Sequence, residues 1–294
     1  MKIIEHWKIW FLISALVIIP GIVSLSMWGL NLGIDFAGGT LLEMQFPAVE
    51  KIDLPKIQET FRSQEINGAQ ISLTSNNSFL SRSHTLEPEK YQALTDALNK
   101  EIGETKEMRL ETVGPTISRD LTQKAILAVI LAILAIIFYV AWAFRTVPRG
   151  YSSWKFGISA IIALGHDLLI VLGAFSLFGH YLNVEIDSLF ITALLTTLGF
   201  SVHDTIVVFD RIRENLKTSS GTFTEIANKS VAETMSRSIN TSATVIFTLL
   251  ALLLFGGASI YWFVMALIIG IIAGTYSSIF NASVVLVLWH RRKH

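Results

Sequence analysis

The 294-residue sequence contains no cysteine and has no net charge, because 23 basic residues balance 23 acidic ones. Without cysteine, the chain has no disulfide bonds and no thiolate metal sites. Without net charge, nothing indicates a bulk electrostatic partner such as a nucleic acid. Charged residues make up only 16% of the sequence and hydrophobic residues 52%, and the mean hydropathy is +0.55. This composition excludes an ordinary soluble enzyme and indicates a membrane protein with several spanning segments.

Six apolar runs are long enough to cross the ~30 Å hydrocarbon core of a bilayer as helices. We expect these spans at residues 9–28, 122–144, 155–178, 187–209, 239–256 and 262–289. The first run is longer than the apolar region of a usual signal peptide, which has roughly 7–15 residues. We therefore expect it to stay in the protein as a membrane helix.

Lysine and arginine in the short loops indicate which side of the membrane each loop faces. The loops between spans two and three and between spans four and five are basic, and so is the C-terminal tail. The loops at 179–186 and 257–261 contain no lysine or arginine. Both termini and the basic loops are therefore expected in the cytoplasm.

The expected organisation has three parts. Residues 1–28 are the cytoplasmic N-terminus and first span, 29–120 an α+β domain outside the cytoplasm, and 121–294 a five-helix transmembrane domain. The last part includes a cytoplasmic loop at 210–238, in which residues 221–238 resemble an amphipathic helix lying along the membrane surface.

The large polar block at 29–120 has the pattern of a small folded domain. Strands are expected at 40–46, 68–73, 78–85 and 106–113, and helices at 54–64 and 88–102. The resulting order is β-α-β-β-α-β, the split-βαβ pattern of ferredoxin-like domains. No cluster of His, Asp and Ser in this block suggests catalysis, so a binding or docking domain is favoured.

One carboxylate, Asp204, lies well inside the fourth expected span, roughly 10 Å below the interface if Arg211 marks it. An aspartate at membrane depth costs about 2.5–3.5 kcal/mol on insertion scales, so such residues are candidates for ion or proton handling. Helical spacing predicts one stripe of Thr197, Ser201 and Asp204 in span four, and another of Arg237, Thr241, Thr244 and Thr248 entering span five. If the two helices pack, Arg237 can reach the level of Asp204. A static ion pair that joins two helices explains these two residues alone equally well.

A second carboxylate, Asp167, lies near mid-membrane in span three. A hydrogen bond that fixes helix packing is a slightly better explanation of Asp167 than proton transfer. His166 and His203 each precede an aspartate, but adjacent helical residues point about 100° apart, so neither pair is expected to form a dyad. The spacings of helical metal sites are absent from the sequence, so no metal is expected.

Span six carries small and polar residues along one face. The Gly-x-x-x-Gly spacing of Gly270 and Gly274 predicts a surface for close helix packing. Asn281, well inside the span, is the only member of this face for which a functional role is a reasonable alternative.

Five motifs occur in an order that resembles one protein family. They are GIDFAGGT (33–40), VGPTISRDL (113–121), GHDLL (165–169), HDTIVVFDRIREN (203–215) and GTYSSIFNAS (274–283). Together they resemble the SecF family of bacterial protein-export membrane proteins, and the similarity extends over nearly the whole chain. The sequence departs from the family at His203, where asparagine is commoner, and at Asn281, where a small apolar residue is usual.

The resemblance implies a fold and a location in the bacterial cytoplasmic membrane. The fold is a polytopic α-helical one, with six transmembrane helices that form an RND-superfamily-like half, plus a small α+β, ferredoxin-like extracytoplasmic domain. The implied function is that of an auxiliary subunit of the Sec translocation machinery. Together with SecD it would assist the SecYEG–SecA translocon and use the proton motive force to pull unfolded exported chains outward. The resemblance implies no enzyme activity and no cofactor.

The resemblance also implies roles for single residues. Asp204 falls on the family's proton-linked aspartate and Arg237 on the arginine that partners it, while Asp167 is a further proton-coupling candidate. The implied mechanism is a protonation switch: burial disfavours the carboxylate of Asp204, and Arg237 favours it when close. Proton entry would loosen the pair, shift the helices and let the outer domain grip or release the exported chain, by alternating access between two halves.

Two other functions remain open. Half of an RND-superfamily small-molecule or lipid exporter would predict a roomy apolar pocket. A translocon assembly scaffold without energy transduction would predict activity that survives neutralisation of Asp204.

Overall fold

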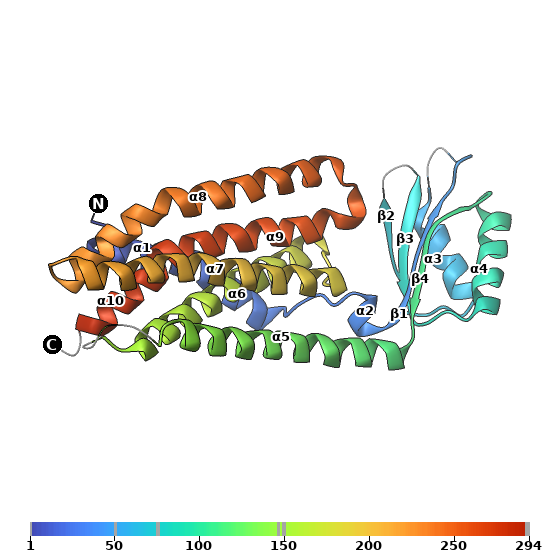
Figure 1. Cartoon of the computed structure of the whole chain (residues 1–294). Helices are drawn as coiled ribbons and strands as arrows, with labels where there is room; N and C mark the ends of the chain where they lie inside the picture. The colour runs from blue at the N-terminus through green and yellow to red at the C-terminus, as the bar shows by residue number, and fades with distance from the viewer. Residues whose placement is uncertain (1, 50–51, 75–76, 146–147, 149–150, 292–294) are drawn as a thin grey trace. The chain divides into compact units, whose positions relative to one another are not determined.

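The computed structural model describes residues 2–49, 52–74, 77–145, 148 and 151–291. Six helical stretches in these ranges are long and apolar enough to cross a membrane, which confirms the six expected spans. They are α1 (Trp7–Met27), α5 (Pro115–Ala143), α6 (Ser153–Leu182), α7 (Ser188–Thr218), α8 (Phe223–Phe255) and the continuous run of α9 (Ala258–Tyr276), η2 (Ser277–Ala282) and α10 (Ser283–Arg291) (Figure 1). A 3-10 turn, η1 (Ile4–His6), precedes α1.

The chain divides into two compact units. The helical unit contains Met1–Asn31 and Leu127–His294, and the sheet unit contains Leu32–Ile126. The chain connects the two units at two places. One connection is the segment after α1, and the other is helix α5, which begins in the sheet unit and ends in the helical unit.

The core of the helical unit lies around α7 and the last helical run. Of the apolar window of each span, 50% is buried in α7 and 61% in the last run, but only 17% in α1 and α8 and 6% in α5. Hydrophobic helices whose apolar side chains stay exposed are suited to lipid or to another membrane helix. The central helices therefore carry the sites that need shielding, and the peripheral ones face outward.

Helices α7 and α8 extend beyond their apolar runs and form a helical hairpin at their charged ends. Helix α8 begins with a capping box, in which Thr222 and Glu225 each satisfy a backbone N–H of the other. The expected amphipathic helix along the membrane surface at 221–238 is wrong, because α8 continues from this cap into span five without a break. Its apolar face packs with Ile212 of α7 in the main core cluster instead of meeting lipid headgroups.

The sheet unit has the predicted β-α-β-β-α-β order, which is confirmed. Its elements are α2 (Ile34–Ala37), β1 (Gly39–Gln45), α3 (Leu54–Ser63), β2 (Gln70–Thr74), β3 (Ser78–Ser83), α4 (Pro88–Glu101) and β4 (Lys106–Val113). The antiparallel sheet has strand order β2-β3-β1-β4, and α3 and α4 cover one of its faces (Figure 1). Alternate residues of β1 point into this core, where Leu42, Met44, Phe61 and Phe79 are fully buried or nearly so.

The glycine pair Gly38–Gly39 marks the sharp entry into β1. The φ angles of these residues are +75° and +125°, a region that favours glycine. A Cβ on Gly39 would also lie 2.4 Å from the carbonyl oxygen of Ser83. The glycines therefore let β1 approach β3 at the point where the chain turns into the sheet.

We predict that residues 36–116, expressed without the spans, fold as a soluble domain. Truncation of the buried Phe79 to alanine should lower its free energy of unfolding by about 3–5 kcal/mol, the usual cost of removing a core phenylalanine. Leu73→Ala, at a side chain that is 47% exposed, is the matched control and should change stability by only about 0.5 kcal/mol. Urea unfolding and amide spectra measure both effects. A spectrum of a disordered chain from the fragment would contradict the boundary.

Candidate functional site

Asp204 lies in the centre of the helical unit, on the face of α7 that meets α8 and α9. Its residue is 2% exposed, and its carboxyl group lies beside the hydroxyls of Ser242 on α8 and Thr275 on α9. Those two hydroxyls hydrogen-bond to each other over 2.6 Å. The Asp204 Oδ2 atom is buried and has no hydrogen-bond partner among the described residues. A buried carboxyl with an unsatisfied oxygen is costly, and intramembrane groups of this kind mark functional sites.

Arg237 is on α8 but is exposed, and among the described residues no ion pair joins it to Asp204. On the same helix, Ser238 and Ser242 are buried against the bundle. Arg237 directly precedes Ser238, so it points about 100° away from the buried face. The sequence placed Asp204 and Arg237 at compatible depths, but the rotation of α8 keeps them apart in this structure.

The rest of the predicted α8 stripe shares the exposed face of Arg237. Thr241, Thr244 and Thr248 are exposed, and each hydroxyl donates to the carbonyl four residues earlier, over 2.8–3.1 Å. Such bonds satisfy the hydroxyl within its own helix. The outward face of α8 therefore carries a polar stripe headed by a cation.

Asp167 on α6 is buried and well supplied with donors. The hydroxyls of Ser201 on α7 and Ser277 at the start of η2 both donate to its Oδ2 atom, the second over 2.8 Å. The structure thus brings Asp167 together with the Asp204 helix, because Ser201 lies one turn before Asp204. It does not bring Arg237 into this group.

His166 contacts Asp167 directly, contrary to the expectation that adjacent helical residues could not form a pair. Its Nδ1 atom lies 2.9 Å from Asp167 Oδ1. The 100° argument concerns the directions of the Cβ atoms, and the long imidazole side chain swings far enough to overcome it. The other ring nitrogen, Nε2, lies 3.0 Å from the Ser14 hydroxyl of α1. Nothing in the sequence singled out Ser14, one of three serines in an apolar helix.

A π-helical turn, η2, directs polar side chains of the last span toward three other helices. Ser277 reaches Asp167 on α6, and Ser278 contacts Thr205 and the Ser201 carbonyl on α7. The amide of Asn281 donates to Ser14 on α1 over 2.9 Å. A π-turn adds a residue to the helical repeat and often occurs at functional sites. Asn281 therefore belongs to the polar cluster of His166 and Asp167.

Close packing of α7 against α9 depends on two glycines, which confirms the predicted packing surface. A Cβ on Gly270 would lie 2.3 Å from Thr197 Cγ2, and one on Gly274 would lie 2.8 Å from Ser201 Cβ. Both distances are far below van der Waals contact. The glycines let the polar face of α7 lie directly against the last span, as small residues do in other membrane interfaces.

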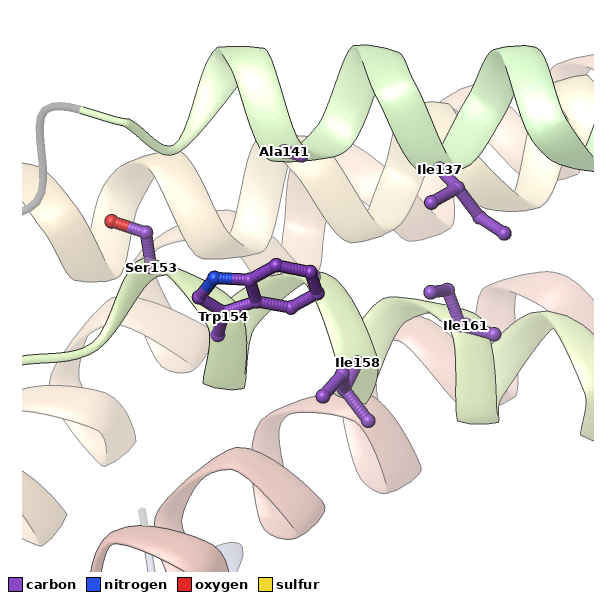
Figure 2. A pocket seen from close by; sticks show the side chains of 7 residues that line it. Ile137, Ala141, Ser153, Trp154, Ile158 and Ile161 are labelled. Atoms are coloured by element: carbon purple, nitrogen blue, oxygen red, sulfur yellow. The ribbon is translucent and has the colours of Figure 1, made fainter.

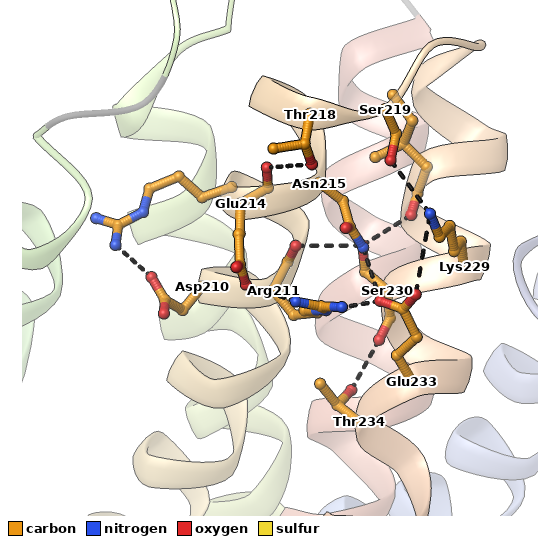
Figure 3. Close-up of polar contacts among 12 residues, drawn as sticks. Asp210, Arg211, Glu214, Asn215, Thr218, Ser219, Lys229, Ser230, Glu233 and Thr234 are labelled. Atoms are coloured by element: carbon orange, nitrogen blue, oxygen red, sulfur yellow. Dashed lines mark hydrogen bonds and ion pairs between the residues drawn. The ribbon is translucent and has the colours of Figure 1, made fainter.

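The charged ends of α7 and α8 are joined by a polar network (Figure 3). Arg211 on α7 pairs with Glu233 on α8 and with Glu214, both over 2.6 Å. The buried Asn215 donates to Ser230 and to Glu233, both over 2.9 Å. The sequence analysis did not identify Asn215 as part of such a network. Because exposed ion pairs contribute little singly, the buried amide is the specific element that fixes the two helices side by side.

The surface of the helical unit has apolar grooves among its described residues. One, of about 280 Å³, is lined by α8 and the last span and includes Ser242 and Thr275, the neighbours of Asp204. Another, of about 160 Å³, lies between Ile137 and Ala141 of α5 and Trp154, Ile158 and Ile161 of α6 (Figure 2). Both are smaller than the pockets of about 300–1,000 Å³ that bind drug-sized molecules.

Comparison with known proteins gives matches over nearly the whole chain. The family model of the protein export membrane protein SecD/SecF C-terminal region matches residues 93–292, and that of the SecD/SecF GG motif matches residues 24–46. The chain is 46% identical to the protein translocase subunit SecF of Thermobaculum terrenum, over 98% of this chain and 94% of that one. It is 40% identical to the SecF subunit of Anaerolinea thermophila, with the same coverage of both chains.

Solved structures give the same result. The crystal structure of SecDF, a translocon-associated membrane protein from Thermus thermophilus, matches with a TM-score of 0.85 at 32% identity. The match covers 99% of this chain but only 39% of the SecDF chain. SecDF in its super-membrane-facing form matches with a TM-score of 0.68.

We predict that Gly274→Ala destabilises the helical unit, because the new Cβ overlaps Ser201. The expected cost is about 1–3 kcal/mol, as for other overpacked sites. Gly199→Ala on α7 is the matched control, since a Cβ there meets nothing within 4 Å, and it should be neutral or stabilising by up to about 1 kcal/mol. Thermal unfolding in detergent measures both. Equal stability of the two variants would contradict the close packing of α7 on α9.

Proposed function

The chain belongs to the SecD/SecF family of protein-export membrane proteins, and from that premise we propose that it couples the proton motive force to polypeptide export. It acts as an auxiliary subunit of the Sec translocation machinery, together with a SecD-type partner. Its location is the cytoplasmic membrane, with both termini in the cytoplasm. It has no enzyme activity and needs no cofactor.

The observation that carries this proposal is the state of Asp204. The carboxyl group is buried at membrane depth, has the hydroxyls of Ser242 and Thr275 as its hydrogen-bonding neighbours and keeps one oxygen without a partner among the described residues. A static structural carboxylate would have a cation or enough donors to offset its burial. A group that gains and loses a proton needs an environment that tolerates both forms, and hydroxyls can either donate or accept.

Arg237 is the proposed partner of Asp204 in the state in which the carboxyl group has lost its proton. In this structure it points about 140° around α8 from Ser242, the residue of α8 that lies beside Asp204, an arrangement suited to the neutral carboxyl. Loss of the proton leaves a carboxylate that attracts the guanidinium. A turn of α8 about its axis would then bring Arg237 toward Asp204, and only 17% of the apolar window of α8 is buried to resist that motion. Asp167 remains a further proton-coupling candidate, because its partner Ser201 lies one turn before Asp204 on α7.

The exposed polar stripe of α8 supports a partner within the membrane. Arg237 in hydrocarbon would be costly unless another protein surface or the membrane interface receives it. The Thermus thermophilus SecDF chain is more than twice as long as the part that this chain matches, and a SecD-type subunit of similar build would supply the missing half. The SecYEG channel, the SecA motor and the exported polypeptide are the further partners of the proposed cycle.

The exporter alternative predicts a roomy apolar pocket, and neither groove favours it, because both lie below the volume of typical small-molecule pockets. The scaffold alternative makes the opposite prediction for Asp204. A scaffold requires neither its unsatisfied oxygen nor its burial, so neutralising the side chain should leave a scaffold active.

We predict that Asp204→Asn abolishes the stimulation of export by a proton gradient while assembly with the partner persists. The amide keeps the shape of the carboxyl group but cannot exchange a proton. Export into proteoliposomes that contain the translocon, its motor and the partner, with and without an imposed gradient, measures the effect. The matched control is Asp210→Asn on the same helix, at an exposed carboxylate paired with Arg213, which should keep the stimulation. Full stimulation in the Asp204→Asn protein would refute the coupling role.

We also predict that the membrane partner covers the polar stripe of α8. Because the chain has no cysteine, single cysteines can be placed at Thr248 and at Leu250, which is 38% exposed. Residues i and i+2 of a helix point about 200° apart, but their Cα atoms differ by only ~3 Å along the helix axis. The two cysteines therefore face opposite sides of α8 at nearly the same depth in the membrane. Thr248→Cys should cross-link to the partner strongly and Leu250→Cys weakly. Equal cross-linking at both positions would place the interface elsewhere.

A further inference from the structure

The geometry points to His166 as a second proton-binding residue of the membrane region, separate from Asp204. We propose that it carries its proton as an imidazolium between Asp167 and Ser14. The side chains of His166 and Asp167 are 9% and 5% exposed, so neither is hydrated from the surface. The sequence comparison with relatives assigns no role to this histidine.

Both ring nitrogens of His166 have a partner, and each can be satisfied in two protonation states. In the neutral state, Nδ1–H donates to Asp167 Oδ1 over 2.9 Å, and Nε2 accepts from the Ser14 hydroxyl over 3.0 Å. In the charged state, Nε2–H donates to Ser14 Oγ instead. The only further change needed is a rotation of the Ser14 hydroxyl, so that its proton no longer points at Nε2.

The hydroxyl oxygen of Tyr276 is positioned to accept a hydrogen bond from the rotated Ser14 hydroxyl. Its own hydroxyl donates to the Trp10 carbonyl over 2.6 Å, which leaves its oxygen free to accept from Ser14, 3.4 Å away. Ser14 Oγ also accepts from the amide of Asn281 over 2.9 Å. A serine hydroxyl has one donor and two acceptor positions, so His166, Asn281 and Tyr276 use its full capacity in the charged state. The proton can therefore enter with one hydroxyl rotation and no change of packing.

The charges around the ring favour the entry of a proton. Asp167 lies beside the ring on α6 and Tyr276 on the last span, while α7 carries Asp204, one turn beyond Ser201, and the exposed His203. The cations of these helices lie toward the helix ends: Lys8 is exposed near the start of α1, Lys155 donates to the Trp289 carbonyl, Arg211, Arg213 and Lys217 are in the last turns of α7, and Arg291 is at the end of α10. The cluster thus carries the negative charge of Asp167 alone, and a proton on His166 makes it neutral. Burying a neutral pair costs less than burying a single charge.

This arrangement gives the proposed export cycle a second position for a proton, and in that respect the inference rests on the proposed function. The Ser201 hydroxyl donates to Asp167, and Asp204 lies three residues further along the same helix. When a proton binds at His166, the His166–Asp167 cluster changes from negative to neutral. This change alters the electrostatic potential at Asp204, because the surroundings have a low dielectric constant. Proton binding at His166 and at Asp204 should therefore depend on each other.

The test is ¹⁵N spectroscopy of the histidine rings in the full chain, reconstituted in lipid nanodiscs. His166→Gln identifies the His166 signals among those of the seven histidines. Spectra are recorded from about pH 8 to about pH 5, which brackets the ordinary titration range of an imidazole. We expect the His166 ring to pass from one protonated nitrogen to two. A ring that stays a neutral tautomer over the whole range overturns the proposal, and this wild-type measurement needs no variant to fold.

Asp167→Asn tests whether the carboxylate holds the charged ring. An opposite charge within hydrogen-bonding distance changes the ratio of charged to neutral forms by about 10- to 1,000-fold, so the ratio of doubly to singly protonated rings should fall at least tenfold at a given pH. His180, on the same helix but stacked on Trp28 at its far end, is the control ring and should be unaffected. An unchanged His166 titration in Asp167→Asn would overturn the pairing. Intact gradient stimulation in Asp204→Asn would refute the coupling proposal without touching this result, since the ring signals alone decide whether His166 binds a proton.

Discussion

The burial of carboxylates inside a membrane bundle is the constraint on which the rest of the structure depends. Lipid offers no hydrogen bonds, so each buried polar group has to find its partners within the protein. Asp167 meets this requirement with two serine hydroxyls and a histidine ring. Asp204, a turn away along α7 from Ser201, meets it only in part. Asp167 is thus a carboxylate whose charge is held by its donors, whereas Asp204 is a buried carboxyl with one oxygen unsatisfied among the described residues.

The close approach of the helices makes these short hydroxyl contacts possible. Serine side chains reach only a short distance, so the backbones that carry them have to lie nearly in contact. Gly270 and Gly274 allow this between α7 and the last span, and Gly21 and Gly173 allow it between α1 and α6, where a Cβ on Gly173 would lie 2.6 Å from Gly21 Cα. The π-turn then sets the rotation of the last span so that its serines and Asn281 face different helices. Small residues and one irregular turn thus place the donors around Asp167.

Helix α8 stands apart from this tightly packed centre. Its charged end is held to α7 by Asn215, Arg211 and Glu233, whereas its apolar length is mostly exposed and borders a groove beside Thr275. A helix anchored at one end and lightly packed along its length can rotate or shift at low cost. That combination is what a switch between a neutral Asp204 and an Asp204–Arg237 pair requires. The same exposure leaves the polar stripe of α8 available to a membrane partner.

The sequence by itself determined the six spans and the β-α-β-β-α-β order, because apolar length and alternation are local properties of the chain. It also determined that Asp204 and Asp167 lie at membrane depth and that Gly270 and Gly274 pack closely, since both follow from position along a helix. It did not determine the contact between His166 and Asp167, the contacts of Ser14 or Asn215, the continuous course of α8, or the outward direction of Arg237. Each of these depends on how far a helix is rotated about its axis and which neighbour it meets. Only the packing of several helices at once sets that rotation, and so the tertiary structure decided which of the predicted residues meet.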